Sequence, residues 1–230
     1  MCEEDQDLSL FECETLAELF NNNVKRFGDR KCLGSREVFG EEDERQLDGK
    51  IFRKLILGDY KWLTYKEADE RVEHLARGLY LQGVKPGDMV MIFAETKAEW
   101  LLCAYAVFRI GAHIATLYAT LGQEAIVHGI NETEVTHIIT SFDLLPKFEA
   151  VKNELKNLQT IIYFEGHKKI NPPPLNDCAV IPLSVIEEQG KNSKERFYFQ
   201  AKSKDDTAIC MYTSGSTCKQ SFYLIFLVSS

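Results

Sequence analysis

Hydrophobic residues recur at intervals of three and four along several stretches of this chain, a period that gathers side chains on one face of an α-helix. Within residues 65–81 that face includes Val72, Leu75 and Leu79, and the pattern ends at Gly83. Glycine commonly follows a helix because it adopts a left-handed backbone at little cost. Helices are therefore predicted over the residue ranges 15–27, 65–81, 96–109, 121–129 and 144–155.

A capping signal stands at the start of the predicted helix over 96–109, and a second one stands at residues 184–187. Thr96 stands three residues before Glu99, and Ser184 stands three residues before Glu187. In such a capping box, each side chain satisfies a free N–H of the first helical turn. We therefore expect one helix to begin at Thr96 and another at Ser184.

Short apolar runs lie between the predicted helices, and their length is typical of buried strands. They occupy residues 89–93, 113–118, 137–140, 160–164, 179–183 and 208–211. Strands that alternate with helices pair in parallel through crossover connections. The predicted fold is therefore α/β, a layered and mostly parallel sheet flanked by helices.

The residues before the predicted sheet, 41–65, show a different pattern. Residues 51–57 alternate in polarity and residues 61–65 are short and apolar, so we predict two strands joined by a turn at Gly58 and Asp59. The charged residues 41–50 are predicted to be a solvated loop. Further on, the triple proline at 172–174 predicts an extended surface linker, because proline fixes φ and donates no hydrogen bond.

Composition narrows the class of protein. With 230 residues and 45% hydrophobic residues, the chain has material for a sizeable core. Its formal charge of -8 excludes a surface built to neutralise nucleic-acid phosphates, which requires clustered Lys and Arg. Nucleic acid is therefore not expected as a partner.

Cysteine usage and the terminal segment indicate the compartment. The seven cysteines are odd in number and show no C-x-x-C spacing, so neither a disulfide framework nor a zinc site is predicted. The acidic N-terminus differs from a secretory signal, and no apolar run approaches the roughly 20 residues of a membrane-spanning helix. A reducing, cytosol-facing compartment follows.

Other chemically active residues show no pattern of a site. The five histidines lie in different predicted elements without metal-ligand spacing, so no metal site is predicted. Glu95, Glu99 and Trp100 resemble an acid pair beside a stacking platform, but capping and core packing explain them better.

A loop rich in hydroxyl groups follows the last predicted strand. It reads Tyr-Thr-Ser-Gly-Ser-Thr over residues 212–217. Glycine permits close approach of the backbone, successive N–H groups can converge on an anion, and Ser and Thr add donors. The Walker spacing is absent, and on chemistry alone an ordinary Ser/Gly turn remains the favoured alternative.

The loop resembles the phosphate-binding loop of the adenylate-forming, AMP-binding enzymes. Two further segments, E-T-K-A-E-W-L at 95–101 and T-L-Y-A-T-L-G at 116–122, resemble the long-chain acyl-CoA synthetases. The segments L-I-L-G-D-Y-K-W-L at 55–63 and V-H-G-I-N-E-T-E at 127–134 look most like the branch of the endoplasmic reticulum and lipid droplets. The resemblance covers residues 15–217, about the first third of a family member.

This resemblance implies a two-step ligase. A fatty acid carboxylate attacks the α-phosphate of Mg²⁺-ATP, and the thiolate of coenzyme A then displaces AMP to form acyl-CoA. The implied ATP phosphate contacts are Thr213, Ser214, Gly215, Ser216 and Thr217. Tyr212 is expected to pack. Membrane association at the endoplasmic reticulum or lipid droplets is implied by the family alone, and the oligomeric state stays open.

The sequence departs from the family after the loop. Where the family has glycine and then lysine, this chain has Cys218 and Ser221. We therefore expect residues 1–14 to be an acidic leader, 15–217 a truncated AMP-binding region of an incomplete fold, and 218–230 a non-matching tail. No catalytic residue is assigned, and the chain alone is expected to be inactive. The alternative is a non-catalytic binding or regulatory module of the same fold.

Overall fold

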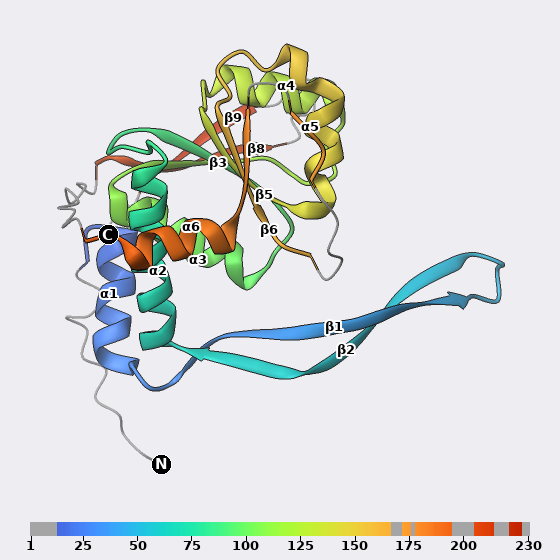
Figure 1. Cartoon of the computed structure of the whole chain (residues 1–230), viewed down its shortest axis with the longest axis horizontal. Coiled ribbons are helices and arrows are strands. Elements are labelled where there is room, and N and C mark those ends of the chain that lie inside the picture. Colours follow the sequence, from blue (N-terminus) through green and yellow to red (C-terminus); the bar gives the residue numbers. More distant parts are fainter. Residues whose placement is uncertain (1–12, 167–171, 176–177, 195–204, 214–220, 227–230) are drawn as a thin grey trace.

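The computed structural model describes residues 13–166, 172–175, 178–194, 205–213 and 221–226. A sheet with helices on both faces forms the body, and a long two-stranded ribbon extends from it (Figure 1). This arrangement confirms the predicted α/β class.

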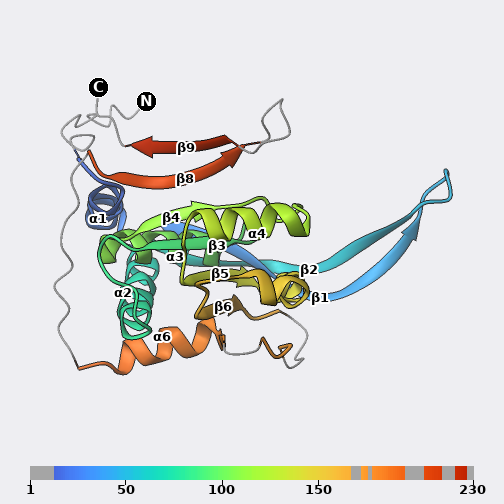
Figure 2. The same cartoon turned by 90° about the horizontal axis from the view of Figure 1, so that it is seen from above.

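The sheet has seven strands in the order β7-β6-β5-β3-β4-β8-β9. Figure 2 shows the strands from β6 to β9 on edge. Neighbouring strands pair in parallel throughout, except that β9 is antiparallel to β8. The strands are β3 (Met89–Phe93), β4 (His113–Thr116), β5 (His137–Ser141), β6 (Thr160–Phe164), β7 (Ala179–Pro182), β8 (Thr207–Thr213) and β9 (Ser221–Phe226). The six predicted strands are confirmed, and β9 is an addition from the predicted tail.

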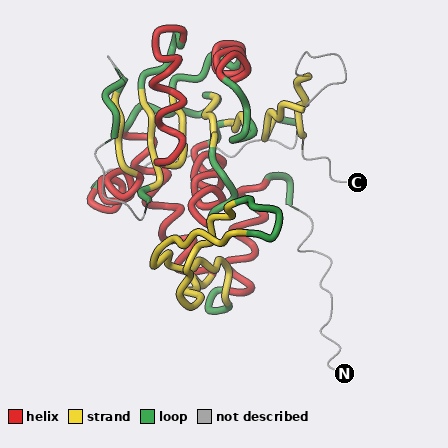
Figure 3. Tube along the Cα trace, turned by 90° about the vertical axis from the view of Figure 1, so that its right-hand side faces the viewer, coloured by secondary structure: helices red, strands yellow, loops and turns green. Residues whose placement is uncertain are grey.

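Two hydrophobic cores fill the two faces of this sheet, and Figure 3 shows helices on both sides. The first core lies under α1 (Leu16–Phe27), α2 (Tyr65–Leu81), α3 (Ala98–Ile110) and α6 (Leu183–Asn192). The second lies under α4 (Gln123–Glu132) and α5 (Leu145–Val151). Strand β3 serves both, because Val90 and Ile92 face the first core while Met91 and Phe93 face the second. This is the alternation of a strand buried on both faces.

Helix α2 has the predicted bounds, and its start is better capped than the sequence analysis recognised. The Thr64 side chain accepts a hydrogen bond from the Glu67 N–H, and the Glu67 carboxylate accepts one from the Thr64 N–H. Helix α1 is also confirmed, with Thr15 as its N-cap. Helix α3 ends at Gly111, whose φ of 81° is left-handed as a glycine cap requires.

Both predicted capping boxes are wrong. Helix α3 begins at Ala98 after Lys97, and helix α6 begins at Leu183 after Pro182, each without a side-chain cap. Glu187 instead accepts two hydrogen bonds from Arg71 of α2, each 2.8 Å long. A bidentate hydrogen bond to a guanidinium is stronger than a capping hydrogen bond from a neutral N–H. The contact with Arg71 therefore decides the orientation of the Glu187 side chain.

Helices α2 and α6 cross at two glycines. A Cβ on Gly78 would lie 2.1 Å from the Ile186 carbonyl oxygen, and one on Gly190 would lie 1.8 Å from the His74 carbonyl oxygen. Any larger residue at either position would push the helices apart. The missing side chains therefore set how closely α6 approaches α2.

Two further helices are shifted or broken relative to the prediction. Helix α4 begins two residues later than predicted, at Gln123, and extends to Glu132. The predicted helix over 144–155 is a short α5 flanked by the 3₁₀ turns η2 (Phe142–Leu144) and η3 (Lys152–Glu154). Pro146 lies in the first turn of α5, where its missing N–H costs nothing.

The predicted hairpin at Gly58 and Asp59 is wrong. Strand β1 (Lys31–Arg45) pairs antiparallel with β2 (Ile51–Thr64) along its whole length, and the turn lies at residues 46–50. The first half of the predicted solvated loop over 41–50 is therefore strand. Its acidic side chains face cations across the ribbon, as in the pairs Arg53–Glu41 at 3.6 Å and Lys54–Glu44 at 3.8 Å. Cross-strand pairing of opposite charges stabilises a strand that composition alone presents as a loop.

Candidate nucleotide site

The carboxyl ends of β3, β4 and β8 border a cavity of about 350 Å³, which we call the carboxyl-edge cavity. Ligands of open α/β sheets bind in the crevice outside the carboxyl ends of the strands. Its lining residues are Ile92, Ala94, Glu95, Thr96, Trp100, Thr116, Leu117, Tyr118, Ala119, Met211 and Tyr212. The cavity has the size and position of a small-molecule site.

Two of these residues were set aside in the sequence analysis. Trp100 packs against the first core as predicted, yet it also lines the carboxyl-edge cavity. Glu95 makes no helix cap; it accepts a 2.7 Å hydrogen bond from the Ser141 hydroxyl at the end of β5. Both residues follow β3, which ends at Phe93. Their position just after the carboxyl end of a predicted parallel strand is the sequence signal that could have identified them as lining residues.

The loop after β4 forms another wall and is held from α5. The Lys147 ammonium donates to the carbonyl oxygens of Ala119 at 2.7 Å and Leu121 at 3.0 Å. The same ammonium lies 5.8 Å from the centre of the Phe93 ring. The segment 116–122, which resembles the acyl-CoA synthetases, thus borders the cavity. The Lys147 ammonium holds it in place.

Strand β8 ends at this edge, directly before the sequence of the predicted phosphate-binding loop. Thr213 is its last residue, and Ser214, Gly215, Ser216 and Thr217 lie outside the described residues. Thr213 pairs with Ser221 of β9, so residues 214–220 connect two antiparallel strands. The predicted loop is therefore joined directly to the strand that lines the carboxyl-edge cavity.

Tyr212 is 2% exposed, which confirms that it packs. Its hydroxyl also donates a 2.5 Å hydrogen bond to the Glu132 carboxylate at the end of α4. Burial, followed by this hydrogen bond, raises the pKa of Tyr212 well above its usual range. Tyr212 therefore remains a neutral donor and ties β8 to α4 one residue before the loop.

His113, His128 and His137 make separate local contacts. His137 contacts the Gln82 carbonyl oxygen at 3.0 Å, and His113 contacts the Thr207 carbonyl oxygen, so both join neighbouring segments. His128 is exposed on α4, 3.3 Å from Glu132. Within the described ranges, no group of three or more His, Cys, Asp or Glu residues is placed to hold a metal ion. Nor does any described helix have the length and apolar character to cross a membrane.

Comparison with known proteins gives consistent matches. The model of the AMP-binding enzyme family matches residues 39–220. Long chain acyl-CoA synthetase 8 of Arabidopsis thaliana is 36% identical over 210 residues, which are 88% of this chain and 28% of that protein. Long-chain-fatty-acid–CoA ligase 1 of Schizosaccharomyces pombe is 28% identical over 90% of this chain and 32% of its own length.

The fold has solved counterparts as well. The A-PCP didomain of the carboxylic acid reductase from Segniliparus rugosus, in complex with AMP, matches with a TM-score of 0.76. The alignment covers 96% of this chain and 34% of that one at 17% identity. This likeness shows the fold. The chain thus spans about a third of the length of the proteins it matches.

Proposed function

The chain belongs to the AMP-binding enzyme family, and from this membership we propose that it forms the N-terminal part of an ATP-dependent long-chain fatty acid–CoA ligase. The reaction converts a fatty acid, ATP and coenzyme A into acyl-CoA, AMP and diphosphate. Similarity to long-chain acyl-CoA synthetases over most of this chain supports the substrate class. Because the match covers only 28% and 32% of those relatives, the activity of the whole protein is a proposal.

The observation that carries the proposal is the position of Thr213. It ends a parallel strand beside the carboxyl-edge cavity, and a hydroxyl-rich segment with Gly215 follows it. In our proposal Thr213, Ser214, Gly215, Ser216 and Thr217 hold the ATP phosphates through hydroxyl and backbone N–H donors. ATP, accompanied by Mg²⁺, supplies the activating phosphoryl chemistry, and no Mg²⁺ ligand is assigned to this chain.

The structure suggests how this chain's own residues contribute. Lys147 fixes the wall at Ala119, and the Tyr212–Glu132 bond fixes the strand that carries Thr213. Donors that are held in place before the ligand arrives bind an anion without the cost of ordering them. The role of this region is therefore to bind and position the nucleotide.

A specific departure favours the second candidate, a non-catalytic binding module of the same fold. The position of the family lysine holds Ser221, and Ser221 begins β9 as the pairing partner of Thr213. A hydroxyl carries no positive charge to offset a phosphate. On this ground we propose that the 230-residue polypeptide binds nucleotide without forming acyl-CoA by itself.

The cellular location is proposed from sequence resemblance. The segments at 55–63 and 127–134 resemble the branch of the endoplasmic reticulum and lipid droplets, and we propose a cytosol-facing location at one of these membranes. Residues 55–63 lie in the exposed ribbon and residues 127–134 in and after α4. Fractionation of cells expressing the tagged chain, with recovery in the membrane or lipid-droplet fraction, tests the proposal.

The binding proposal is tested by titrating the 230-residue chain with ATP in a calorimeter. Thr213→Val removes the first hydroxyl of the loop, and we expect an affinity about tenfold lower, the value of roughly one hydrogen bond to a charged group. Thr207→Val at the opposite end of β8 is the matched control and should bind as the parent does. Absence of ATP binding by the parent, or equal affinities of parent and Thr213→Val, contradicts the proposed site.

The activity proposal needs a separate measurement. The same chain is incubated with palmitate, ATP, Mg²⁺ and coenzyme A, and acyl-CoA is measured by mass spectrometry. We expect nucleotide binding without thioester formation. Detectable acyl-CoA would show that Ser221 suffices and would remove the non-catalytic candidate.

A further inference from the structure

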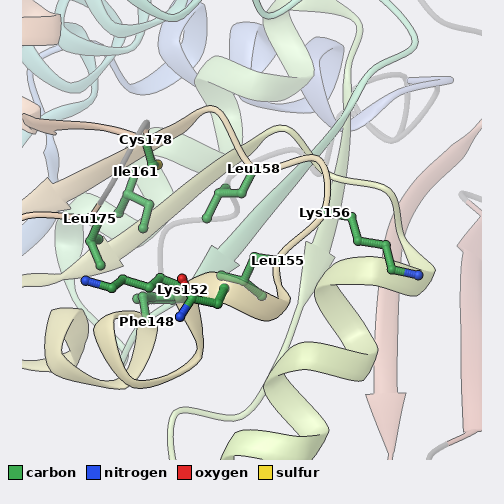
Figure 4. A pocket seen from close by; sticks show the side chains of 9 residues that line it. Phe148, Lys152, Leu155, Lys156, Leu158, Ile161, Leu175 and Cys178 are labelled. Carbon is green, nitrogen blue, oxygen red and sulfur yellow. The ribbon is translucent and has the colours of Figure 1, made fainter.

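The apolar surface most open to a partner lies on the ribbon rather than in a cavity. Figure 4 shows a cavity of about 250 Å³ beside α5, lined in part by Lys152 and Phe148, but Phe148 is fully buried and offers no surface to an occupant. Most of the exposed large apolar side chains of the described residues belong instead to β1, β2 and the turn between them. They are Phe39, Leu47, Ile51, Phe52, Leu55, Ile56, Leu57, Tyr60 and Trp62.

The outer part of the ribbon, residues 39–57, is apolar on both faces. Successive residues of a strand point to opposite faces, and the neighbours Ile51 and Phe52 are both exposed, as are Leu55 and Ile56. A strand pair with one covered face would bury one residue of each such pair. The outer part therefore carries apolar surface that the body of this chain does not cover.

The inner part of the ribbon, residues 31–38 and 58–64, carries two stacked rings with cations beside them. The Tyr60 and Trp62 rings lie 5.5 Å apart, and a Cβ on Gly34 would meet the Trp62 ring at 2.9 Å, so this ring covers bare backbone. The Arg36 guanidinium lies 5.4 Å from the centre of the Tyr60 ring. The Lys31 ammonium lies 5.1 Å from the centre of the Trp62 ring.

This composition is typical of a protein interface. Tryptophan, tyrosine and arginine supply most of the binding energy where proteins meet. On the ribbon, Trp62, Tyr60 and Arg36 already hold one another in place, which lowers the entropy lost when a partner binds. The aromatic pair of Tyr60 and Trp62 is therefore a preformed anchor for a protein partner.

The charges of the ribbon favour a second copy of this chain over a charged surface. Residues 31–64 contain seven cations and seven carboxylates, so the ribbon has no net attraction for anionic lipid or nucleic acid. The inner part has three cations and two carboxylates, a net charge of +1, whereas the outer part has four cations and five carboxylates, a net charge of -1. Two antiparallel ribbons bring the inner part of each beside the outer part of the other, so opposite net charges meet.

The apolar surface is also large enough for a dimer. At roughly 200 Å² for each large side chain, the exposed residues named above present about 1,000 Å². One face of each ribbon supplies about half of this surface, so two copies bury about 1,000 Å² in total, the size at which specific interfaces begin. The ribbon extends clear of the body in Figures 1 and 2, so two ribbons can lie together with the bodies at opposite ends.

We propose that two copies of this chain associate through their ribbons, face to face and antiparallel, about a two-fold axis. The Tyr60–Trp62 pair of each copy packs against the outer apolar side chains of the other. The association is noncovalent, and its size predicts a dissociation constant on the order of 10 µM. The proposal stands on the ribbon and does not depend on the proposed ligase function.

Analytical ultracentrifugation of the 230-residue chain tests the association. We expect the dimer to predominate about tenfold above the dissociation constant and the monomer of 26.3 kDa about tenfold below it. Tyr60→Glu places a carboxylate in both halves of the symmetric interface, so the dissociation constant should rise at least about tenfold. Val185→Glu, at an exposed apolar position of α6, is the matched control and should leave the constant unchanged. Circular dichroism confirms that both variants are folded.

Photocrosslinking tests the antiparallel arrangement. Leu47 is fully exposed in the turn, so benzoylphenylalanine at this position leaves the ribbon intact. At about 3.3 Å for each residue, the turn lies about 40 Å from Trp62 of its own chain and reaches the inner part of a ribbon only in a second copy. We expect the crosslinked peptide to contain residues 31–36 or 58–64. A mixture of isotope-labelled and unlabelled chains identifies crosslinks between copies.

Four results overturn the proposal. A chain that stays monomeric at the highest concentration, or a dimer that persists unchanged in folded Tyr60→Glu, excludes the ribbon interface. Crosslinks that join the turns of two copies exclude the antiparallel arrangement. Flotation of a monomeric chain with vesicles of phosphatidylcholine and phosphatidylserine, lost in Tyr60→Glu, assigns the aromatic pair to a lipid surface instead.

Discussion

The Tyr212 hydroxyl donates a 2.5 Å hydrogen bond to the carboxylate of Glu132, joining β8 to the last residue of α4. Tyr212 is buried under the second core, whereas Glu132 is partly exposed. The bond fixes the strand one residue before Thr213, the first residue of the proposed phosphate-binding loop. It therefore connects the packing of the sheet to the geometry of the proposed site.

Loss of this bond should cost stability. Tyr212→Phe keeps the ring in the core and removes the donor, so we expect the free energy of unfolding to fall by about 1.5 kcal/mol. This is the lower end for a hydrogen bond to a charged group, because Glu132 is partly solvated. Urea denaturation measures it. Tyr118→Phe, at a ring that is 60% exposed, is the control and should leave the value unchanged. Equal stability of Tyr212→Phe and the parent would show that the bond contributes nothing.

The same bond predicts a pH dependence. Burial and Glu132 raise the pKa of folded Tyr212 above the ordinary value of 10.0, so folding favours the protonated hydroxyl. The resulting stabilisation is complete below pH 10 and is lost as the pH rises above it. The difference in unfolding free energy between the parent and Tyr212→Phe should thus stay constant from pH 7 to 9 and shrink above pH 10. A difference that grows above pH 10 would contradict the direction of the shift.

The close crossing of α2 and α6 predicts a large effect of one methyl group. Gly190→Ala places a Cβ against the His74 carbonyl oxygen, and we expect a loss of at least about 1–3 kcal/mol, the usual cost of overpacking. Gly40→Ala in the ribbon, whose Cβ would meet only the end of the Ile56 side chain at 3.9 Å, should have little effect. Thermal unfolding followed by circular dichroism compares the two. Similar melting temperatures for both variants would mean that the helices separate at no cost.

In the dilute monomer, the ribbon should open independently of the body. Its outer part carries exposed apolar side chains such as Phe52 and Leu55 and pairs only with its own partner strand. An isolated two-stranded ribbon is marginally stable in water. We therefore expect amides of residues 41–55 to exchange hydrogen far faster than those of β5, which is buried throughout. Protection equal to that of β5 would indicate that the ribbon is covered in solution.

Local patterns determined much of this fold. Helix α2 was predicted from the apolar periodicity of residues 65–81, and the parallel strands were predicted from the short apolar runs. Both predictions succeeded because the spacing of buried side chains along the chain differs between a helix and a strand. The end of α3 was predicted from Gly111 alone, because a left-handed C-cap depends on one residue that can adopt a positive φ. The family was identified from the hydroxyl-rich motif and four other segments that resemble acyl-CoA synthetases. This identification required no knowledge of the packing.

Only the tertiary structure decided which of two alternative contacts a side chain makes, one local in sequence and one distant. Glu187 matched a helix cap in sequence but pairs with Arg71, which is 116 positions earlier. The acidic residues Glu41, Asp43 and Glu44 matched a loop but face cations on β2. Gly58 matched a turn but lies inside a strand. The cavity around Glu95 and Trp100, and the cavity beside Lys152, likewise exist only once distant strands are adjacent. Periodicity reports what one element buries, whereas these features depend on which other element it meets.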